Sequence, residues 1–152
     1  MLIKTHLSIT LFFVLIFLSK VEHKFWFVTI ALIATCIPDV DSRYSFLGKK
    51  KINRILQFFT KHRGIIHSFT FLTLVTLILL RFVPVLALGF FLGYSSHLLV
   101  DSFTKQGIVP FYPWKAKSHG FVRTGGKLEL GILISFVIVD FVLIISKIAG
   151  LF

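Results

Sequence analysis

An imidazole and a carboxylate, His97 and Asp101, close a long apolar segment of the sequence. Their four-residue spacing places both side chains on one face of an α-helix, one turn apart. Helices present paired metal ligands in this way, and ionisable groups are costly beside hydrocarbon unless they have a use there. The pair therefore indicates a divalent-metal site at the end of a membrane-embedded helix.

Four further polar clusters lie at the ends of the other apolar segments. His6 lies at the start of the first segment, Asp39 and Asp41 follow the second, and Glu129 opens the last. The run His62-Arg63-Gly64-Ile65-Ile66-His67-Ser68 opens the third. Neutral imidazoles and carboxylates are the ligands of zinc and related divalent ions, and several helices together can hold two or more ions. Water bound to such an ion becomes a hydroxide nucleophile near neutral pH.

Each cluster also has a simpler interpretation. His6 is close enough to the terminus to be an interfacial residue, and Pro38-Asp39 is typical of a helix stop followed by a turn. Asp41 fits a carboxylate that accepts a hydrogen bond from a metal ligand, and it also fits a helix cap. Arg63 is able to grip a phosphate bidentately, but it is also a charge that sets membrane topology. Glu129 is a favourable charge at a helix N-terminus whether or not it binds metal.

Two histidines, His62 and His67, are five residues apart, a spacing that does not place both rings on one helical face. We therefore expect His67 to be the ligand on the helix and His62 to lie in the preceding loop. His119, between Ser118 and Gly120, fits an ordinary loop histidine and also a further ligand.

The composition places the chain in the membrane class. Of 152 residues 56% are hydrophobic, 19 are Phe, and the mean hydropathy is +0.91. No small-x-small cleavage site follows the first apolar segment, so it is expected to be a retained span. The prediction is an all-α integral membrane helical bundle forming one domain over residues 1–152, with five spans at about 7–19, 25–37, 65–80, 82–100 and 128–146.

Alternation of five spans puts the N-terminus and both long loops, 38–64 and 103–127, on one side of the membrane. That side holds thirteen Lys and Arg residues against four on the other. The positive-inside rule then places the polar clusters at the cytoplasmic face of the membrane. Asp140, deep in the last segment, is expected to pair with Arg81 or Lys20 or to snorkel outward.

The charge of the chain and the aromatic residues of its loops indicate which kinds of partner to expect. A net charge of +11 is drawn to anionic lipid headgroups, and it also suits nucleic acid or a phosphorylated substrate. The rings of Pro110-Phe111-Tyr112-Pro113-Trp114 fit an interfacial platform better than a base-stacking surface, so no specific nucleic-acid binding is expected.

The single Cys36 excludes an internal disulfide. The oligomeric state is not encoded in any pattern of the sequence.

The order of these motifs resembles that of the bacterial membrane-bound metal-dependent hydrolases, also described as LexA-binding, inner membrane-associated hydrolases. The resemblance rests on Thr5-His6, Pro38-Asp39-Val40-Asp41, His62-Arg63-Gly64 with His67-Ser68, His97-Leu-Leu-Val-Asp101 with Thr104 and Gly107, and Arg123-Thr124-Gly125-Gly126 with Glu129. That family is distantly similar to zinc-dependent phospholipases C and single-strand-specific nucleases, although this chain has no N-terminal Trp ligand and fewer His residues. The metal ligands that the resemblance implies are His6, Asp39, His67, His97, Asp101 and Glu129.

The resemblance implies a metal-dependent hydrolase. A phosphoester suits such a site best, and a phospholipid is the simplest substrate because the site is expected to open at headgroup depth. Because this chain has fewer His residues than the related enzymes, we expect one or two ions of Zn²⁺ or, alternatively, Mn²⁺ or Fe²⁺. In the implied mechanism the metal activates water, Asp39 or Asp41 steers that water, and Arg63 stabilises the developing charge, with His62 beside it. The alternative function is a non-catalytic membrane protein whose metal is structural and whose basic loops anchor a soluble regulatory partner. A metal-ion carrier fits less well, because carriers bind near the membrane midplane.

Overall fold

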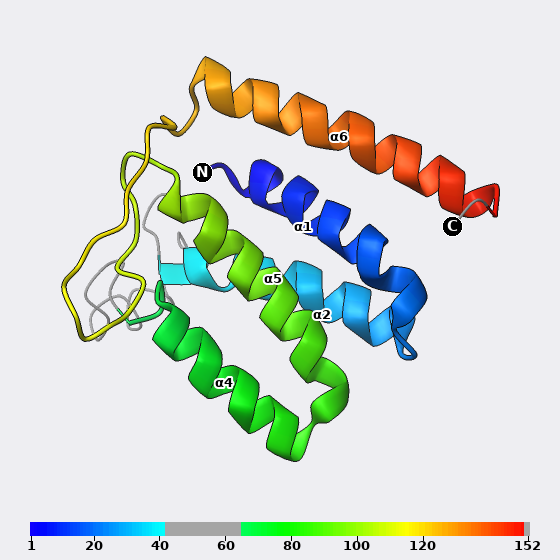
Figure 1. The fold of residues 1–152 in the computed structure, drawn as a ribbon, viewed down its shortest axis with the longest axis horizontal. Coiled ribbons are helices and arrows are strands. Elements are labelled where there is room, and N and C mark those ends of the chain that lie inside the picture. The colour runs from blue at the N-terminus through cyan, green and yellow to red at the C-terminus, as the bar shows by residue number, and fades with distance from the viewer. Residues whose placement is uncertain (42–64, 151–152) are drawn as a thin grey trace.

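A computed structural model describes residues 1–41 and 65–150, with the backbone alone for Val40 and Asp41. These residues form five α-helices and two short 3-10 turns (Figure 1). No strand occurs among them, only two isolated bridges in the loop after the fourth helix. The predicted all-helical membrane bundle is confirmed. The elements are α1 Ile3–Phe17, η1 Leu18–Lys20, α2 Lys24–Cys36, η2 Pro38–Asp41, α4 Phe69–Phe82, α5 Pro84–Ser102 and α6 Lys127–Ile148.

Helix α4 begins later than the sequence suggests, because its first residue is set by a cap. The Ser68 hydroxyl accepts a hydrogen bond from the Phe71 backbone N–H at 3.2 Å, which satisfies one of the free donors of the first turn. The third span was expected from about residue 65, and helix α4 begins four residues later, at Phe69. At the other end of α4, Pro84 begins α5, where the fixed φ of proline suits the first helical turn.

Three helical segments are long and apolar enough to cross a bilayer: Ile3–Lys20, Pro84–Ser102 and Lys127–Ile148. Helices α2 and α4 are shorter apolar helices of 13 and 14 residues. Most side chains of α6 are exposed although the helix is strongly apolar. Such a surface is stable against lipid and unfavourable against water.

Helix α5 is the centre of the bundle and contacts α1, α2 and α4, whereas α6 contacts α1 alone among the described helices. Helices α5 and α2 approach each other closely, and a Cβ on Gly93 would collide with the Ala31 backbone. Glycine at that position allows the two helix axes to approach each other. Tyr94 and Leu98, both fully buried on α5, pack against residues of α2 and α4 in the hydrophobic core.

The alternating helices bring one set of ends together. The N-terminus, the ends of α2 and α5 and the starts of α4 and α6 all lie at the same end of the molecule (Figure 1). The expectation that the polar clusters share one end of the bundle therefore holds for the described clusters.

Candidate metal centre

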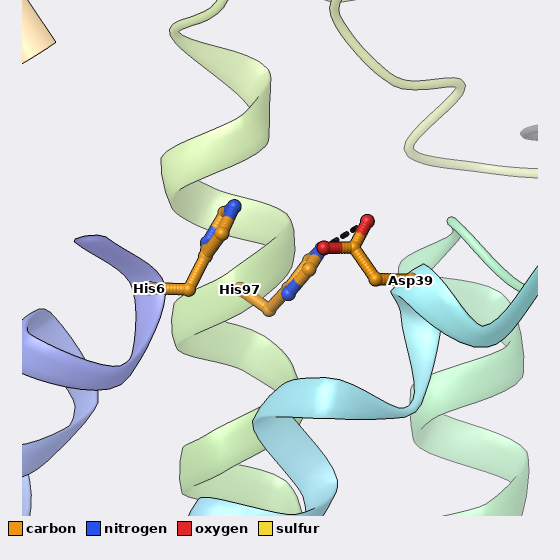
Figure 2. A group of neighbouring side chains, drawn as sticks. All are labelled: His6, Asp39 and His97. Carbon is orange, nitrogen blue, oxygen red and sulfur yellow. Dashed lines mark ion pairs between the residues drawn. The ribbon is translucent and has the colours of Figure 1, made fainter. Parts of the chain in front are cut away.

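His97, fully buried on α5, is at the centre of the polar cluster. Its Nδ1 lies 2.7 Å from the Thr35 carbonyl oxygen at the end of α2. A carbonyl only accepts hydrogen bonds, so Nδ1 carries the proton and the lone pair of Nε2 is left for a ligand. Nε2 lies 3.7 Å from an Asp101 oxygen and 4.0 Å from an Asp39 oxygen. This is the arrangement that orients metal-binding imidazoles, and Figure 2 shows Asp39 facing the His97 ring.

His6 on α1 lies against the other side of His97. The two rings are stacked with centroids 3.9 Å apart and an interplanar angle of 8°. Nε2 of His6 is 3.3 Å from Asp101 Oδ1, and the amino group of Met1 is 2.6 Å from the same oxygen. The Asp101 carboxylate thus faces cationic or metal-binding groups from α1 as well as from α5.

His67 completes the cluster from the turn before α4. Its Nε2 lies 4.0 Å from Asp101 Oδ2, and its ring is 5.8 Å from that of His97, edge to face. The expectation that His67 lies on the helix was wrong. Ser68 is the N-cap and the helix begins at Phe69, so His67 lies in the turn before it. The turn is held by the buried Tyr94 hydroxyl, which donates to the Ile66 carbonyl at 2.6 Å.

These side chains form two overlapping groups of potential ligands, His6–Asp39–His97 and His67–His97–Asp101. Within each group the ligand atoms lie within 4.8 Å of one another. The side chains of all these residues are at most 1% exposed except that of Asp39, at 14%. Three imidazoles and two carboxylates are a donor set suited to zinc and related ions. Within the described residues, Nε2 of His97 and Nδ1 of His6 are buried without a hydrogen-bond partner, which is costly unless a ligand fills that role.

Asp39 reaches the cluster from η2, directly after the end of α2. A helix stop at Pro38 and a metal-facing carboxylate are therefore compatible, and the two interpretations of Pro38-Asp39 do not compete. Asp41 ends η2, and its side chain lies outside the described part of the chain, as do His62 and Arg63 altogether. The catalytic roles of those three residues stay predictions.

Glu129 lies at the edge of the cluster and belongs to neither group of potential ligands. Its buried carboxylate accepts hydrogen bonds from the Leu2 N–H at 2.5 Å, the Gly125 N–H at 2.5 Å and the Thr5 hydroxyl at 3.0 Å. These bonds join the start of α6 to the start of α1, one residue from His6. The described hydrogen bonds give Glu129 the role of an anchor for the helix that carries His6, and its expected role as a metal ligand stays a prediction.

Several residues that support the cluster were not identified from the sequence as functional. Thr35 supplies the carbonyl for His97, and its hydroxyl joins a buried chain to Thr10 and Ser96, which links α1, α2 and α5 below the imidazoles. Tyr94 was not singled out either. The signal for Thr10, Thr35 and Ser96 was available, because each is a hydroxyl within an apolar helix that needs a buried partner.

The end of α5 explains the spacing of Thr104 and Gly107 from Asp101. The Thr104 hydroxyl donates to the Asp101 carbonyl at 2.7 Å and accepts from the Gly107 N–H at 3.1 Å. Gly107 has a φ of 61°, and a Cβ there would also collide with the Ser118 carbonyl. The three residues together end the helix directly after its last ligand.

Two further ionisable residues lie apart from the cluster. Asp140 is 4% exposed and accepts a hydrogen bond from the Ser8 hydroxyl at 2.9 Å, so the expected pairing with Arg81 or Lys20 was wrong. The nearer partner is on α1, the helix against which α6 packs. His119 is exposed and belongs to neither group of ligands.

The sequence profile of a family described as "YdjM inner membrane protein" matches residues 1–151 of the chain. The chain is 35% identical over 121 residues to the inner membrane protein YdjM of Escherichia coli, covering 71% of this chain and 62% of that protein. The same values hold for the Shigella flexneri protein of that name. It is 27% identical over 85 residues to the uncharacterized protein YvsG of Bacillus subtilis, covering 53% of each chain. No solved structure matches the chain.

Proposed function

The chain belongs to the YdjM family of inner membrane proteins, and on that premise we propose that its cluster of histidines and aspartates binds a divalent metal and hydrolyses a phosphoester at the membrane surface. The observation that carries the proposal is the convergence of His6, Asp39, His67, His97 and Asp101 from four separate segments at one end of the bundle. Most of these groups are buried, and a protein without a use for them would bear a large desolvation cost.

Zinc is the ion that suits the donor set best, with Mn²⁺ or Fe²⁺ as alternatives, and two overlapping groups that share His97 accommodate one or two ions. When bound, such an ion supplies Lewis-acid activation of water and of a phosphoryl oxygen. His97 keeps its orientation through the Thr35 carbonyl, and His6 and His67 close the two sides of the cluster. Asp39 is the more exposed of the two carboxylates of the cluster, and we assign to it the acceptance of a proton from an incoming water.

The proposal is tested by measuring both the metal content and the phosphoester hydrolysis of the same protein samples. The protein is purified in mild detergent without chelator or a polyhistidine tag, together with His97→Ala and the matched control His119→Ala, and all three are analysed by elemental mass spectrometry. We expect near-stoichiometric metal in the wild type and the control, loss of at least ten-fold in His97→Ala, and hydrolysis of phosphoesters that follows the metal. A conservative variant, Asp101→Asn, covers the case in which His97→Ala does not fold. Full activity in folded, metal-free protein would rule the proposal out.

One observation favours a second candidate, a structural metal in a protein that anchors a soluble partner, such as LexA, through its basic loops. Four of the five ligand side chains are at most 1% exposed, which is typical of sites whose coordination is completed by protein. Substitution of the metal with Co²⁺ separates the two functions. Visible absorption that shifts when inorganic phosphate is added indicates an open coordination position, whereas an unchanged tetrahedral spectrum supports the structural role.

A further inference from the structure

Two stretches of the loop between α5 and α6 are held side by side by backbone hydrogen bonds. The Lys105 N–H donates to the Val122 carbonyl at 2.9 Å, and the Val122 N–H donates to the Phe103 carbonyl at 3.1 Å. A second pair of bonds joins Ile108 and Ser118. This pairing fixes Lys105 beside Arg123, although the two residues are far apart along the chain.

An open cleft of about 580 Å³ lies where this loop meets the start of α6. Its walls carry three exposed cations, Lys105, Arg123 and Lys127, and the hydroxyl of Thr124. Among the described residues, no acidic side chain lines the cleft and none forms an ion pair with the three cations. Three like charges that share one cleft raise the local concentration of anions there.

Exposed apolar side chains lie in the same walls. Phe121 is 70% exposed and Leu128 is 57% exposed, and both line the cleft beside the cations. On the same side of α6 as Leu128, further along the helix, Val139 and Val142 are 40% and 55% exposed. A ligand that fits both parts carries a negative headgroup joined to long apolar chains.

We propose that this basic cleft, formed by Lys105, Phe121, Arg123, Thr124, Lys127 and Leu128, binds the phosphate headgroup of an anionic phospholipid whose acyl chains lie along α6. None of its residues is a ligand of the candidate metal centre. Lipid binding is therefore separable from hydrolysis, and the inference goes beyond the proposed function and does not need it. A free phosphate supplies the same charge but would leave the apolar walls in water.

The experiment measures retained lipid rather than activity. Detergent-purified, delipidated protein is mixed with micelles that contain phosphatidylglycerol or phosphatidylcholine, and bound lipids are counted by native mass spectrometry. The test variant is Lys105→Gln/Arg123→Gln/Lys127→Gln. The matched control, Lys20→Gln/Lys24→Gln/Arg81→Gln, removes the same charge from the opposite end of the bundle.

Each cation near an anionic headgroup contributes roughly five-fold in affinity, so we expect the test variant to bind phosphatidylglycerol about a hundred-fold more weakly. The control variant is expected to bind as the wild type does, and phosphatidylcholine is expected to bind weakly throughout. Equal losses in the two variants overturn the proposal, because the attraction would then be that of net charge alone. Displacement of the lipid by millimolar inorganic phosphate overturns the assignment to a phospholipid, since it shows that the acyl chains add nothing. A Phe121→Ser/Leu128→Ser variant that binds as tightly as the wild type also overturns it.

Discussion

The substitution of Glu129 tests whether this residue is a ligand or an anchor. Its carboxylate accepts from two backbone donors, Leu2 N–H and Gly125 N–H, and from the Thr5 hydroxyl. A buried donor left without an acceptor costs about 1–3 kcal/mol, and the hydroxyl is free to rotate to another acceptor. The two backbone donors therefore set the cost, and Glu129→Ala is expected to lower the free energy of unfolding by about 2–6 kcal/mol.

Glu129→Gln keeps an oxygen for Leu2 and Thr5 but turns an amide NH₂ toward the Gly125 N–H. One bond is then lost, and the free energy of unfolding is expected to fall by about 1–3 kcal/mol. Unfolding is followed by circular dichroism in mixed micelles with increasing dodecyl sulfate, and metal is measured in the same samples. As an anchor, Glu129→Gln retains full metal occupancy when metal is saturating, whereas Glu129→Ala binds metal roughly 10–100-fold more weakly because His6 is less well placed.

The control for this experiment is Asp101→Asn, which removes a carboxylate that faces His6, His67 and His97. If Glu129→Gln remains folded and loses metal as completely as Asp101→Asn, Glu129 is a ligand and the reasoning from its hydrogen bonds is refuted. An Ala variant as stable as the wild type would refute the claim that this carboxylate joins α6 to α1.

Three further outcomes follow from the packing and the cluster. Tyr94→Phe leaves the Ile66 carbonyl without its donor, so we expect a loss of about 1–3 kcal/mol in unfolding free energy and weaker metal binding, measured by chelator competition. Gly93→Leu is expected to prevent native packing of α5 on α2, which near-ultraviolet circular dichroism would detect. Gly131→Leu, where a Cβ meets nothing within 4 Å, is expected to keep the native spectrum and to be no less stable than the wild type. Removing the metal is expected to lower stability by about 2.7 kcal/mol relative to protein held at 100 times the dissociation constant, and His97→Ala should show no such dependence.

Much of the architecture was predictable because its signals are local. Apolar runs bounded by polar residues gave five helices, and the His97-x-x-x-Asp101 spacing placed both side chains on one face, as the 3.7 Å contact confirms. The shared end of the bundle followed from simple alternation of antiparallel helices. The start of α4 was misplaced because a Ser cap after an apolar pair is a weak signal, and Ile65 and Ile66 continue the hydrophobic pattern without being helical.

The partners of individual side chains were not predictable, because they depend on which helices touch. Glu129 was grouped with the ligands because it lies at the same end of the bundle as the other candidate ligands (Figure 1). Its carboxylate accepts from the Thr5 hydroxyl and from two backbone N–H groups, and no sequence pattern marks those two N–H groups as needing an acceptor. Asp140 was assigned to distant cations for the same reason, whereas a serine on the adjacent helix provides the hydrogen bond.

The position of α5 explains which helices carry ligands. Each helix that contacts α5 has a potential ligand at or just beyond its end: His6 on α1, Asp39 after α2 and His67 before α4. Helix α6 contacts only α1 among the described helices, so its polar groups, Glu129 and Asp140, reach the cluster indirectly by holding α1 at two points. A ligand must come within about 2 Å of a shared ion, which only neighbours of His97 and Asp101 can do. Among the described helices, α1, α2, α4 and α5 therefore carry or flank the potential ligands, and α6 fixes the position of α1, the helix that carries His6.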